Sequence, residues 1–313
     1  MRIKFLFILL IIFVLFVGCG KIHNNNDKSQ INNIAITDVY GNVSHLPQHP
    51  RVVSAYGSFS ECWILSGGEL IGVTDDAIKE RNINLPEHIE IIGTVKDINL
   101  EKVIALNPDF VILSADIASQ ASIGAFLDDL NISYGYFRID SFEDYSKLMR
   151  QFCDFHARED LYTKNVLDIE NQINDIVKSV FAENSKTYLL MRVYSTGIKV
   201  KTDNIADKIL KDLGCVSITD KAPSILNELS IEEIIKNDPD HIFVLTMGDE
   251  KAGEQYFYEN IVNNSAWSGL SAIKNKKFHI LPKDLFHYKP NNRRADSYKY
   301  IADIIYTDID YDD

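Results

Sequence analysis

Two segments of this chain share one pattern at a constant offset of 131 residues, from Leu100 to Ile231. Each begins with a stretch typical of a short helix, breaks at a Pro-Asp pair and continues into an apolar run typical of a buried strand. The two segments read LEKVIALNPDFVIL and IEEIIKNDPDHIFV. A second, weaker match at an offset of 145 residues relates Ile64-Leu65 and Thr74-Asp75-Asp76-Ala77 to Ile209-Leu210 and Thr219-Asp220-Lys221-Ala222. Two matches in the same order predict two lobes of similar build.

The order of the expected elements gives the fold class. Strands alternate with helices, which predicts mainly parallel sheets covered by helices, that is, an α/β protein with two Rossmann-like lobes. Strands are expected at Ile34–Val39, Val43–Leu46, Val52–Ala55, Leu70–Val73, Ile89–Ile92, Phe110–Leu113, Tyr134–Phe137, Thr187–Val193, Ile198–Lys201, His241–Leu245 and Lys277–Leu281. Helices are expected at Ser58–Ser66, Leu100–Leu106, Ala118–Leu130, Asn204–Leu213, Ile231–Asn237 and Ala295–Tyr306.

Two further helices are expected between the halves, at Ser141–Ala157 and Glu159–Ala182. In the second, apolar residues recur every three or four positions without a Gly or Pro, so one apolar stripe runs along about 36 Å of helix. This stripe predicts a single long helix that bridges the lobes stiffly, and a core helix within one lobe is the alternative. The expected boundaries are an N-terminal lobe over 34–140, a helical segment over 141–184 and a C-terminal lobe over 185–313.

The N-terminus indicates export and anchoring. Arg2 and Lys4 precede an apolar run, Phe5–Val17, that is short for a bilayer and typical of a signal peptide, here over 1–18. The small residue directly before Cys19 resembles the lipobox of bacterial lipoproteins, in which the cysteine is lipidated and becomes the first mature residue. The polar stretch over 19–33 would then be a flexible tether. We expect a protein anchored by lipid on the extracytoplasmic face of the cell membrane, with an uncleaved anchor as the alternative.

Charge and motifs argue against several functions. The 45 acidic residues outnumber the 32 basic ones, which argues against nucleic acid as a partner. The sequence lacks a Gly-x-Ser-x-Gly elbow, a Walker loop and a Gly-x-Gly-x-x-Gly motif. Its histidines show no metal-ligand spacing, so we expect no dedicated metal site. The thiols expected to be buried and inert are Cys62, Cys153 and Cys215.

In the order and spacing of its segments, the chain resembles the substrate-binding lipoproteins of ABC importers for ferric siderophores, haem and cobalamin. The resemblance extends over most of Ile34 to Tyr306 and rests on segments such as IGTVKDINLEKVIALNPDFVIL, LSIEEIIKNDPDHIFVL and WSGLSAIKNKKFHILP. It implies two α/β lobes joined by one long helix, with an iron chelate bound between them. It also implies delivery of the chelate to a permease driven by a separate ATPase subunit, without catalysis or a resident cofactor. A ferric siderophore is the leading ligand class, with haem or cobalamin as alternatives.

One glutamate in each repeated helix is a candidate for docking on the permease. Glu101 and Glu232 occupy the same early position after the expected N-caps Asn99 and Ser230. The family that the chain resembles docks one glutamate per lobe on permease arginines, and the shared motif carries this role to Glu101 and Glu232. The alternative role is local, because an acidic side chain near a helix N-terminus is stabilised by about 0.3–1 kcal/mol.

In each lobe, the loop after the first strand carries candidate ligand-binding residues. We consider these loops because ligands bind beyond the carboxyl ends of strands in open α/β sheets. Tyr56 follows the strand of the first lobe. After it, Gly57 is expected to permit a tight turn and Ser58 to cap the next helix. The equivalent loop of the second lobe carries Arg192 and Tyr194. The alternative for each tyrosine is packing within its lobe.

A third candidate loop, PKDLFHYKPNNRR over 282–294, is basic within an acidic protein. Its candidates for ligand contact are His287, Tyr288, Arg293 and Arg294. Arginine binds carboxylates and phosphates through two parallel hydrogen bonds, which suits an anionic chelate, and tyrosine can stack on a flat ligand or coordinate iron. The alternative is that the two arginines form surface ion pairs with Asp284 and Asp296.

Two other classes of function remain open from the sequence. A secreted α/β metal-dependent enzyme would need converging acids and histidines between the lobes, where the loops offer Tyr, Arg and Lys. An adhesion or signalling lipoprotein would need an interface patch and no small ligand.

Overall fold

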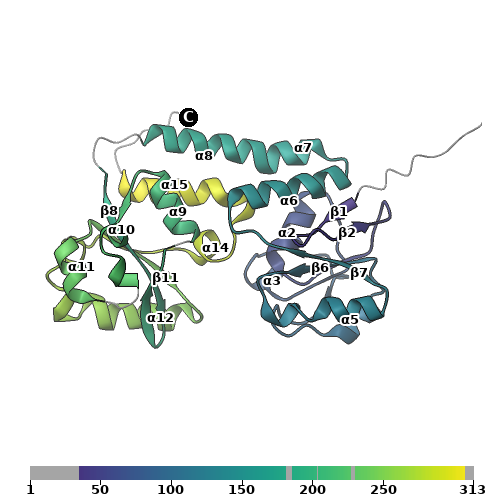
Figure 1. Ribbon diagram of the computed structural model, residues 1–313, viewed down its shortest axis with the longest axis horizontal. Helices are drawn as coiled ribbons and strands as arrows, with labels where there is room; N and C mark the ends of the chain where they lie inside the picture. The colour runs from purple at the N-terminus through teal and green to yellow at the C-terminus, as the bar shows by residue number, and fades with distance from the viewer. Residues whose placement is uncertain (1–34, 181–184, 203, 227–229, 307–313) are drawn as a thin grey trace, which may run out of the picture. The chain divides into compact units, whose positions relative to one another are not determined.

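The computed structural model describes residues 35–180, 185–202, 204–226 and 230–306. The expected signal peptide, Cys19 and the tether lie outside these residues. Within the described part, two sheets of five strands, each with its own helices, form two α/β lobes (Figure 1). This is the predicted fold class.

The sheet of the N-terminal lobe is parallel throughout and has the strand order β5-β4-β3-β6-β7. Its strands are β3 (Val52–Ser54), β4 (Gly72–Val73), β5 (Glu90–Ile91), β6 (Phe110–Ser114) and β7 (Ser133–Phe137). Alternate residues of β6 enter two different core clusters, Phe110 on one face and Val111 on the other, because helices cover both faces. The predicted hairpin of β1 (Ala35–Thr37) and β2 (Val43–His45) precedes the sheet, and Gly41 in its turn has a φ of 84°.

The sheet of the C-terminal lobe is built in the same way, with one exception. Its order is β10-β8-β11-β12, all parallel, and β9 pairs antiparallel with β8. Its strands are β8 (Thr187–Tyr194), β9 (Gly197–Val200), β10 (Val216–Ser217), β11 (His241–Thr246) and β12 (Phe278–Ile280). Alternate residues of β11 again enter two clusters, Phe243 on one face and Ile242 on the other.

The helices around the two sheets bury their apolar faces against the strands. Those of the N-terminal lobe are α2 (Gly57–Leu65), α3 (Asp76–Lys79), α4 (Leu100–Ala105), α5 (Ile123–Asp129) and α6 (Phe142–Phe155). Those of the C-terminal lobe are α9 (Ile205–Asp212), α10 (Ile218–Lys221), α11 (Ile231–Asn237), α12 (Glu250–Phe257), α13 (Ser271–Lys274), α14 (Lys283–Phe286) and α15 (Arg294–Ile305). The thiols of Cys62, Cys153 and Cys215 are buried and free, as predicted.

A continuous helical run over 159–179 contributes to the cores of both lobes. It comprises α7 (Glu159–Tyr162), one π turn over 163–167 and α8 (Asp168–Ser179), and α15 lies alongside α8 (Figure 1). Val166 packs in the core of the N-terminal lobe, whereas Ile176 and Val180 pack in the core of the C-terminal lobe. The apolar stripe therefore predicted a bridging helix correctly, although the run ends at Ser179 and its π turn was not expected.

The two repeated segments have equivalent geometry at both ends of their helices. Asn99 and Ser230 are the N-caps, and each side chain accepts a hydrogen bond from the third backbone N–H of its helix, at 3.0 Å and 3.4 Å. After the helices, Asn107 and Asp238 both adopt left-handed backbone conformations, with φ of 45° and 36°. The sequence repeat is thus a repeat of structure.

Short elements account for most differences from the predicted pattern. The helix expected over 118–130 is a 3-10 turn followed by the shorter α5. The loop expected over 282–294 contains α14 and a second 3-10 turn over 291–293. Among the elements that were not predicted, β10, α3 and α10 have two to four residues and are too short to show a hydrophobic period. The eight-residue helix α12 was also not predicted.

Candidate ligand-binding site

The carboxyl ends of β3 and β6 form a topological switch point in the N-terminal sheet. The chain leaves β3 towards β4 and leaves β6 towards β7, on opposite sides of the pair. In open α/β sheets, ligands bind just outside such a point. Tyr56 follows β3 at this point and Asp116 follows β6, so the structure places the first candidate residue where the sequence predicted it.

Tyr56 is half-buried at the start of α2. Its backbone is extended, and its ring packs edge-on against Phe59 with ring centroids 5.2 Å apart. Burial raises the pKa of the Tyr56 hydroxyl well above its usual range, and the negative charges of Asp76 and Glu80 raise it further. The hydroxyl thus stays protonated to a higher pH than that of an ordinary tyrosine and can donate a hydrogen bond to a ligand.

Gly57 and Ser58 do not have the roles predicted for them. Gly57 lacks a left-handed φ and is needed for close packing, because a Cβ there would lie 2.7 Å from the backbone nitrogen of Ala77. Its N–H donates to Asp76 Oδ2 at 2.7 Å. Ser58 lies within α2 instead of capping it, and its hydroxyl donates to Asn291 Oδ1 at 3.2 Å. The start of α2 is thus held by tertiary contacts and not by a local cap.

Two carboxylates near Tyr56 were not predicted as site residues. Asp76 accepts a hydrogen bond from the Thr74 hydroxyl at 2.6 Å, yet burial raises its pKa despite this bond. Burial also raises the pKa of Glu80, and the charge of Asp76 raises it further. The only signal in the sequence was that Asp76 belongs to the weaker repeat, Thr74-Asp75-Asp76-Ala77, which gives no indication of a site.

The C-terminal sheet has an equivalent switch point between β8 and β11. Arg192 and Tyr194 were predicted in the loop after this strand, but both lie within β8, half-buried at its carboxyl end, because the strand extends to Tyr194 to pair with β9. Lys283 begins α14 just after β12, is 8% exposed, and its ammonium donates to the Gly248 carbonyl at 2.6 Å. Arg192 and Lys283 thus bring two positive charges to this edge of the second lobe, and Lys283 was not predicted as a site residue.

His287 and Tyr288 lie side by side, with ring centroids 5.2 Å apart. Loss of surrounding water lowers the pKa of His287, and the positive charges of Lys283 and Arg192 lower it further. Burial raises the pKa of Tyr288, and the negative charge of Glu80 raises it further. Because Glu80 belongs to the N-terminal lobe and Arg192 to the C-terminal lobe, this pair of rings is within electrostatic reach of both.

A buried polar network fixes the backbone around Tyr288. The Arg81 guanidinium donates to the carbonyls of Tyr288 and Lys289, at 2.9 Å and 2.8 Å, and pairs with Glu61. The Asn291 side chain donates to the same Glu61 carboxylate at 2.6 Å. The Arg81 side chain is only 5% exposed. The sequence gave no signal for this network, because Arg81 and Tyr288 are 207 residues apart.

The neighbouring Arg293 and Arg294 have different surroundings. Arg293 is exposed and forms ion pairs with Asp284 at 2.7 Å and Asp296 at 3.1 Å, which is the alternative considered from the sequence. Arg294 is 3% exposed, pairs with neither acid, and has no hydrogen-bond partner for Nε or Nη2 among the described residues. Burial lowers the pKa of Arg294. The geometry of both arginines favours roles other than direct ligand contact.

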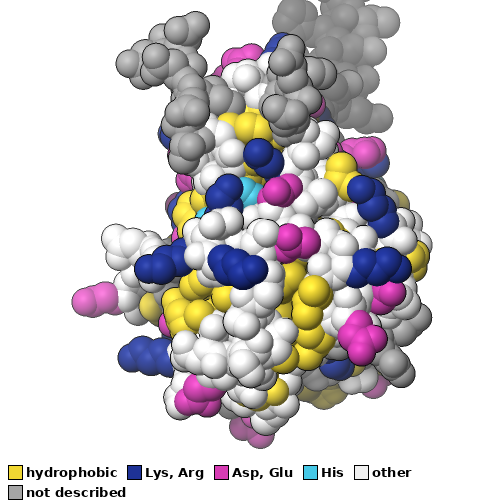
Figure 2. Space-filling model, turned by 90° about the vertical axis from the view of Figure 1, so that its left-hand side faces the viewer, with side chains coloured by type: hydrophobic (Ala, Val, Ile, Leu, Met, Phe, Trp, Pro, Cys, Tyr) yellow, Lys and Arg dark blue, Asp and Glu magenta, His cyan; other side chains and the backbone are white. Residues whose placement is uncertain are grey.

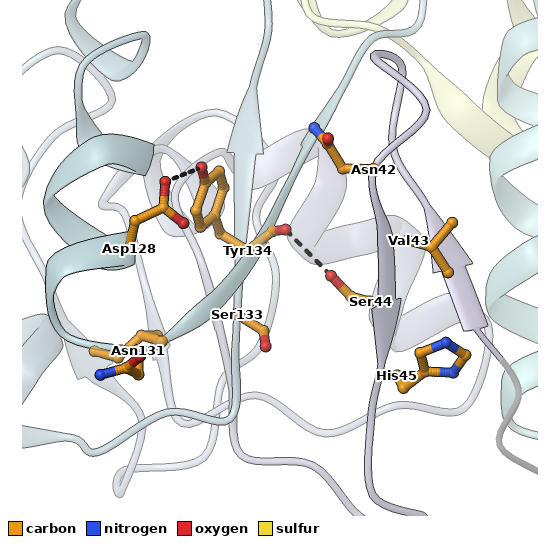
Figure 3. Close-up of a pocket in the computed structure, with 9 residues that line it drawn as sticks. Asn42, Val43, Ser44, His45, Asp128, Asn131, Ser133 and Tyr134 are labelled. Carbon is orange, nitrogen blue, oxygen red and sulfur yellow. Dashed lines mark hydrogen bonds between the residues drawn. The ribbon is translucent and has the colours of Figure 1, made fainter.

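A separate pocket of about 520 Å³ lies beside the edge strand β7 (Figure 3). It is lined by Asn42, Val43, Ser44, His45, Asp128, Asn131, Ile132, Ser133 and Tyr134. The Tyr134 hydroxyl donates to Asp128 at 2.9 Å, and the Ser44 hydroxyl donates to the Tyr134 carbonyl at 3.3 Å (Figure 3). None of the candidate ligand-binding residues lines this pocket, so it is distinct from the site at the switch points.

The two candidate docking glutamates, Glu101 and Glu232, are both exposed. Within the described ranges, neither forms an ion pair. Over the same residues, no group of three or more His, Cys, Asp or Glu side chains is placed to hold a metal ion. The described helices include none with the length and apolar character needed to cross a membrane.

Known proteins resemble this chain over nearly all of its described length. Residues 52–285 match the periplasmic binding protein family. The Fe(3+)-citrate-binding protein YfmC of Bacillus subtilis (strain 168) is 23% identical over 290 residues, which cover 88% of each chain. The putative ABC transporter substrate-binding lipoprotein YhfQ of the same strain is 25% identical over 289 residues, covering 85% of this chain and 86% of YhfQ. The crystal structure of S. aureus IsdE complexed with heme superposes with a TM-score of 0.65 at 18% identity, covering 82% of this chain and 99% of IsdE.

Proposed function

Because the chain belongs to the periplasmic binding protein family, we propose that it is the lipid-anchored receptor of an ABC importer for a ferric siderophore. It would capture the chelate outside the cytoplasmic membrane and deliver it to the permease, while a separate ATPase subunit supplies the energy. The family is one of binding proteins, so the chain itself carries out no chemical step. Cys19 would carry the lipid, as in the lipoprotein that YhfQ is named to be.

The observation that supports the proposal is the position of the segment that carries His287 and Tyr288, because the Tyr288 carbonyl accepts a hydrogen bond at 2.9 Å from Arg81 of the N-terminal lobe. Charges from the N-terminal lobe and from the C-terminal lobe both act on this pair of rings. A ligand in contact with the pair would therefore reach residues of both lobes. The proposed contacts are Tyr56, Arg192, Tyr194, His287 and Tyr288.

The chemistry of these residues favours an oxygen-rich chelate. The Tyr56 hydroxyl is protonated at neutral pH and is available to donate a hydrogen bond to a ligand, and Arg192 adds a cationic donor. The carboxylate, catecholate and hydroxamate oxygens of siderophores are acceptors for such donors, and hydrogen bonds between charged groups are the stronger ones. The relative YfmC is named for binding ferric citrate, a chelate of this chemistry.

Haem is the second candidate, and one residue favours it. His287 is held neutral by partial burial and by nearby positive charges, and a neutral imidazole can coordinate the iron of haem. Cobalamin could be bound in the same position by its metal centre. The relative IsdE was solved with heme.

The ligand is identified by native mass spectrometry of the full protein in detergent, with ferric citrate, a ferric catecholate, a ferric hydroxamate, haem and cobalamin offered separately. We expect a one-to-one complex with a ferric siderophore, weakened about tenfold or more by Arg192→Ala through loss of a charged hydrogen bond. A haem complex whose absorption changes in His287→Ala would favour the second candidate. Failure to bind any of the five ligands would contradict the proposal.

Delivery to the permease would use Glu101 and Glu232, which are exposed at equivalent positions of the two lobes. The double variant Glu101→Ala with Glu232→Ala should abolish uptake and leave the affinity for the chelate intact. Reduced folding stability with normal uptake would instead assign both residues to the stabilisation of their helices.

A further inference from the structure

An exposed isoleucine follows each candidate docking glutamate by three residues. Ile104 in α4 is 41% exposed, and Ile235 in α11 is 40% exposed. These isoleucines are separated by the same 131 residues that relate Glu101 to Glu232. Residues three apart on a helix are neighbours on one face, so each lobe presents a glutamate and an isoleucine side by side.

The helices do not need these isoleucines for their own packing. The preceding residues, Val103 and Ile234, are 1% and 0% exposed and hold the two helices on their lobes. The equivalent caps at both helix ends set the same orientation in each lobe. The outward face of each helix therefore carries an apolar side chain that stays about two-fifths exposed.

The other outward positions of the two helices differ from one lobe to the other. Lys102 in α4 corresponds to Glu233 in α11, and Ala105 corresponds to Lys236. Single apolar residues are common on protein surfaces, but these two recur at one position beside a shared glutamate, while the residues at the other two outward positions change. Figure 2, which views the molecule from the end that carries α11, shows apolar side chains exposed among basic and acidic ones.

We propose that Ile104 and Ile235 are the apolar anchors of the permease interface. The proposal rests on the proposed function and adds to it the chemistry of the partner surface. That surface would offer two apolar pockets, one for each isoleucine, and beside each pocket a basic group for the neighbouring glutamate. Burial of the isoleucine would exclude water from the charged pair and so strengthen it.

The test measures binding of the full lipidated protein to its permease–ATPase complex in lipid nanodiscs. We expect Ile104→Ser with Ile235→Ser to weaken binding about tenfold or more. The loss should persist at about 1 M NaCl, because apolar contacts are not screened by salt, whereas the loss in Glu101→Ala with Glu232→Ala should shrink there. Leu130→Ser, at a residue that is 42% exposed in the N-terminal lobe, is the matched control and should bind as the wild type does.

The outcomes separate the inference from the proposed function. If the glutamate variant binds the permease–ATPase complex weakly and the isoleucine variant binds it normally, the proposed role of Ile104 and Ile235 is refuted and the receptor function stands. If the wild-type protein does not bind the complex, both are refuted. An equal loss in Leu130→Ser would show a general effect of surface polarity and would also overturn the inference. Unchanged melting temperatures and unchanged affinity for the chelate establish that each variant is folded.

Discussion

The two lobes are alike where the chain repeats and differ where their first strands end. In both, the aspartate after the Pro of the repeat accepts a hydrogen bond from a backbone N–H at the start of the neighbouring strand. Asp109 accepts from Arg51 at 2.7 Å, and Asp240 accepts from Thr187 at 2.8 Å. After β3, however, the chain turns at once into α2, whereas after β8 it returns as the antiparallel strand β9. The repeated parts thus provide scaffold and outer surface, and the parts that differ surround the candidate site.

The contacts that join the lobes also lie outside the repeat. Arg81, Glu61 and Asn291 have no counterparts among the repeated segments, and together they hold the chain around Tyr288 against α2. The bridging helix contributes to the cores of both lobes. The geometry of the site should therefore depend on this network more than on either lobe alone.

The largest effect is expected from Arg81→Ala. The substitution removes the cationic partner of Glu61, which keeps only the Asn291 amide as a donor, and it removes the Arg81 donor from the carbonyls of Tyr288 and Lys289. Removing one partner of a buried pair costs about 3–5 kcal/mol, so the free energy of unfolding in urea should fall by about that amount. A loss below about 1 kcal/mol would mean that the Arg81 network does not hold the chain around Tyr288. The contacts outside the repeat would then not determine the geometry of the site.

A smaller effect is expected from Gly57→Ala, with Gly197→Ala as its counterpart in the other lobe. A Cβ at Gly57 would lie 2.7 Å from the backbone of α3, whereas a Cβ at Gly197 meets nothing within 4 Å. Overpacking costs about 1–3 kcal/mol, so Gly57→Ala should lower the urea midpoint and Gly197→Ala should leave it nearly unchanged. Equal effects at the two glycines would show that the start of α2 relaxes easily.

At one position of the repeat, a substitution in the C-terminal lobe introduces the residue found at the equivalent position of the N-terminal lobe. His241 corresponds to Phe110, and its Nδ1 lies 3.1 Å from Nε2 of His279. Burial, with help from the charge of His279, lowers the pKa of His241 to about 4. The unfolded chain then binds more protons than the folded chain between about pH 6.5 and pH 4, so stability is lost as the pH falls through that window.

His241→Phe should remove most of this dependence. Between about pH 7.5 and pH 5, we expect the wild-type free energy of unfolding to fall by about 1–2 kcal/mol through His241, and the variant to lose less. At neutral pH the variant should be slightly less stable, because His279 loses its partner. Urea unfolding at both pH values measures the difference, and an unchanged slope would assign the pH dependence to other groups.

The sequence predicted the two sheets and the helices around them well, because these elements leave hydrophobic periods and a repeated segment in the sequence. Alternating elements predicted the two parallel sheets, the apolar stripe predicted the bridging helix, and strand ends predicted the positions of Tyr56 and Arg192. Asp76 and Glu80 were missed because their approach to Tyr56 depends on the packing of α3 against Gly57. Arg81 was missed because its partners come from the far end of the chain, where no local pattern marks them.

Arg293→Ala should have the smallest effect of the four, and it tests how two adjacent arginines come to differ. A 3-10 turn passes into α15 at this point, so Arg293 faces solvent and Arg294 is buried. The ion pairs of Arg293 with Asp284 and Asp296 are exposed, and such pairs contribute about 0–1 kcal/mol to stability. We expect Arg293→Ala to change the urea midpoint little and to leave the affinity for the chelate unchanged. A loss of affinity of tenfold or more would instead mean that Arg293 exchanges its two carboxylates for those of the ligand, and that the basic loop binds the chelate as its sequence first indicated.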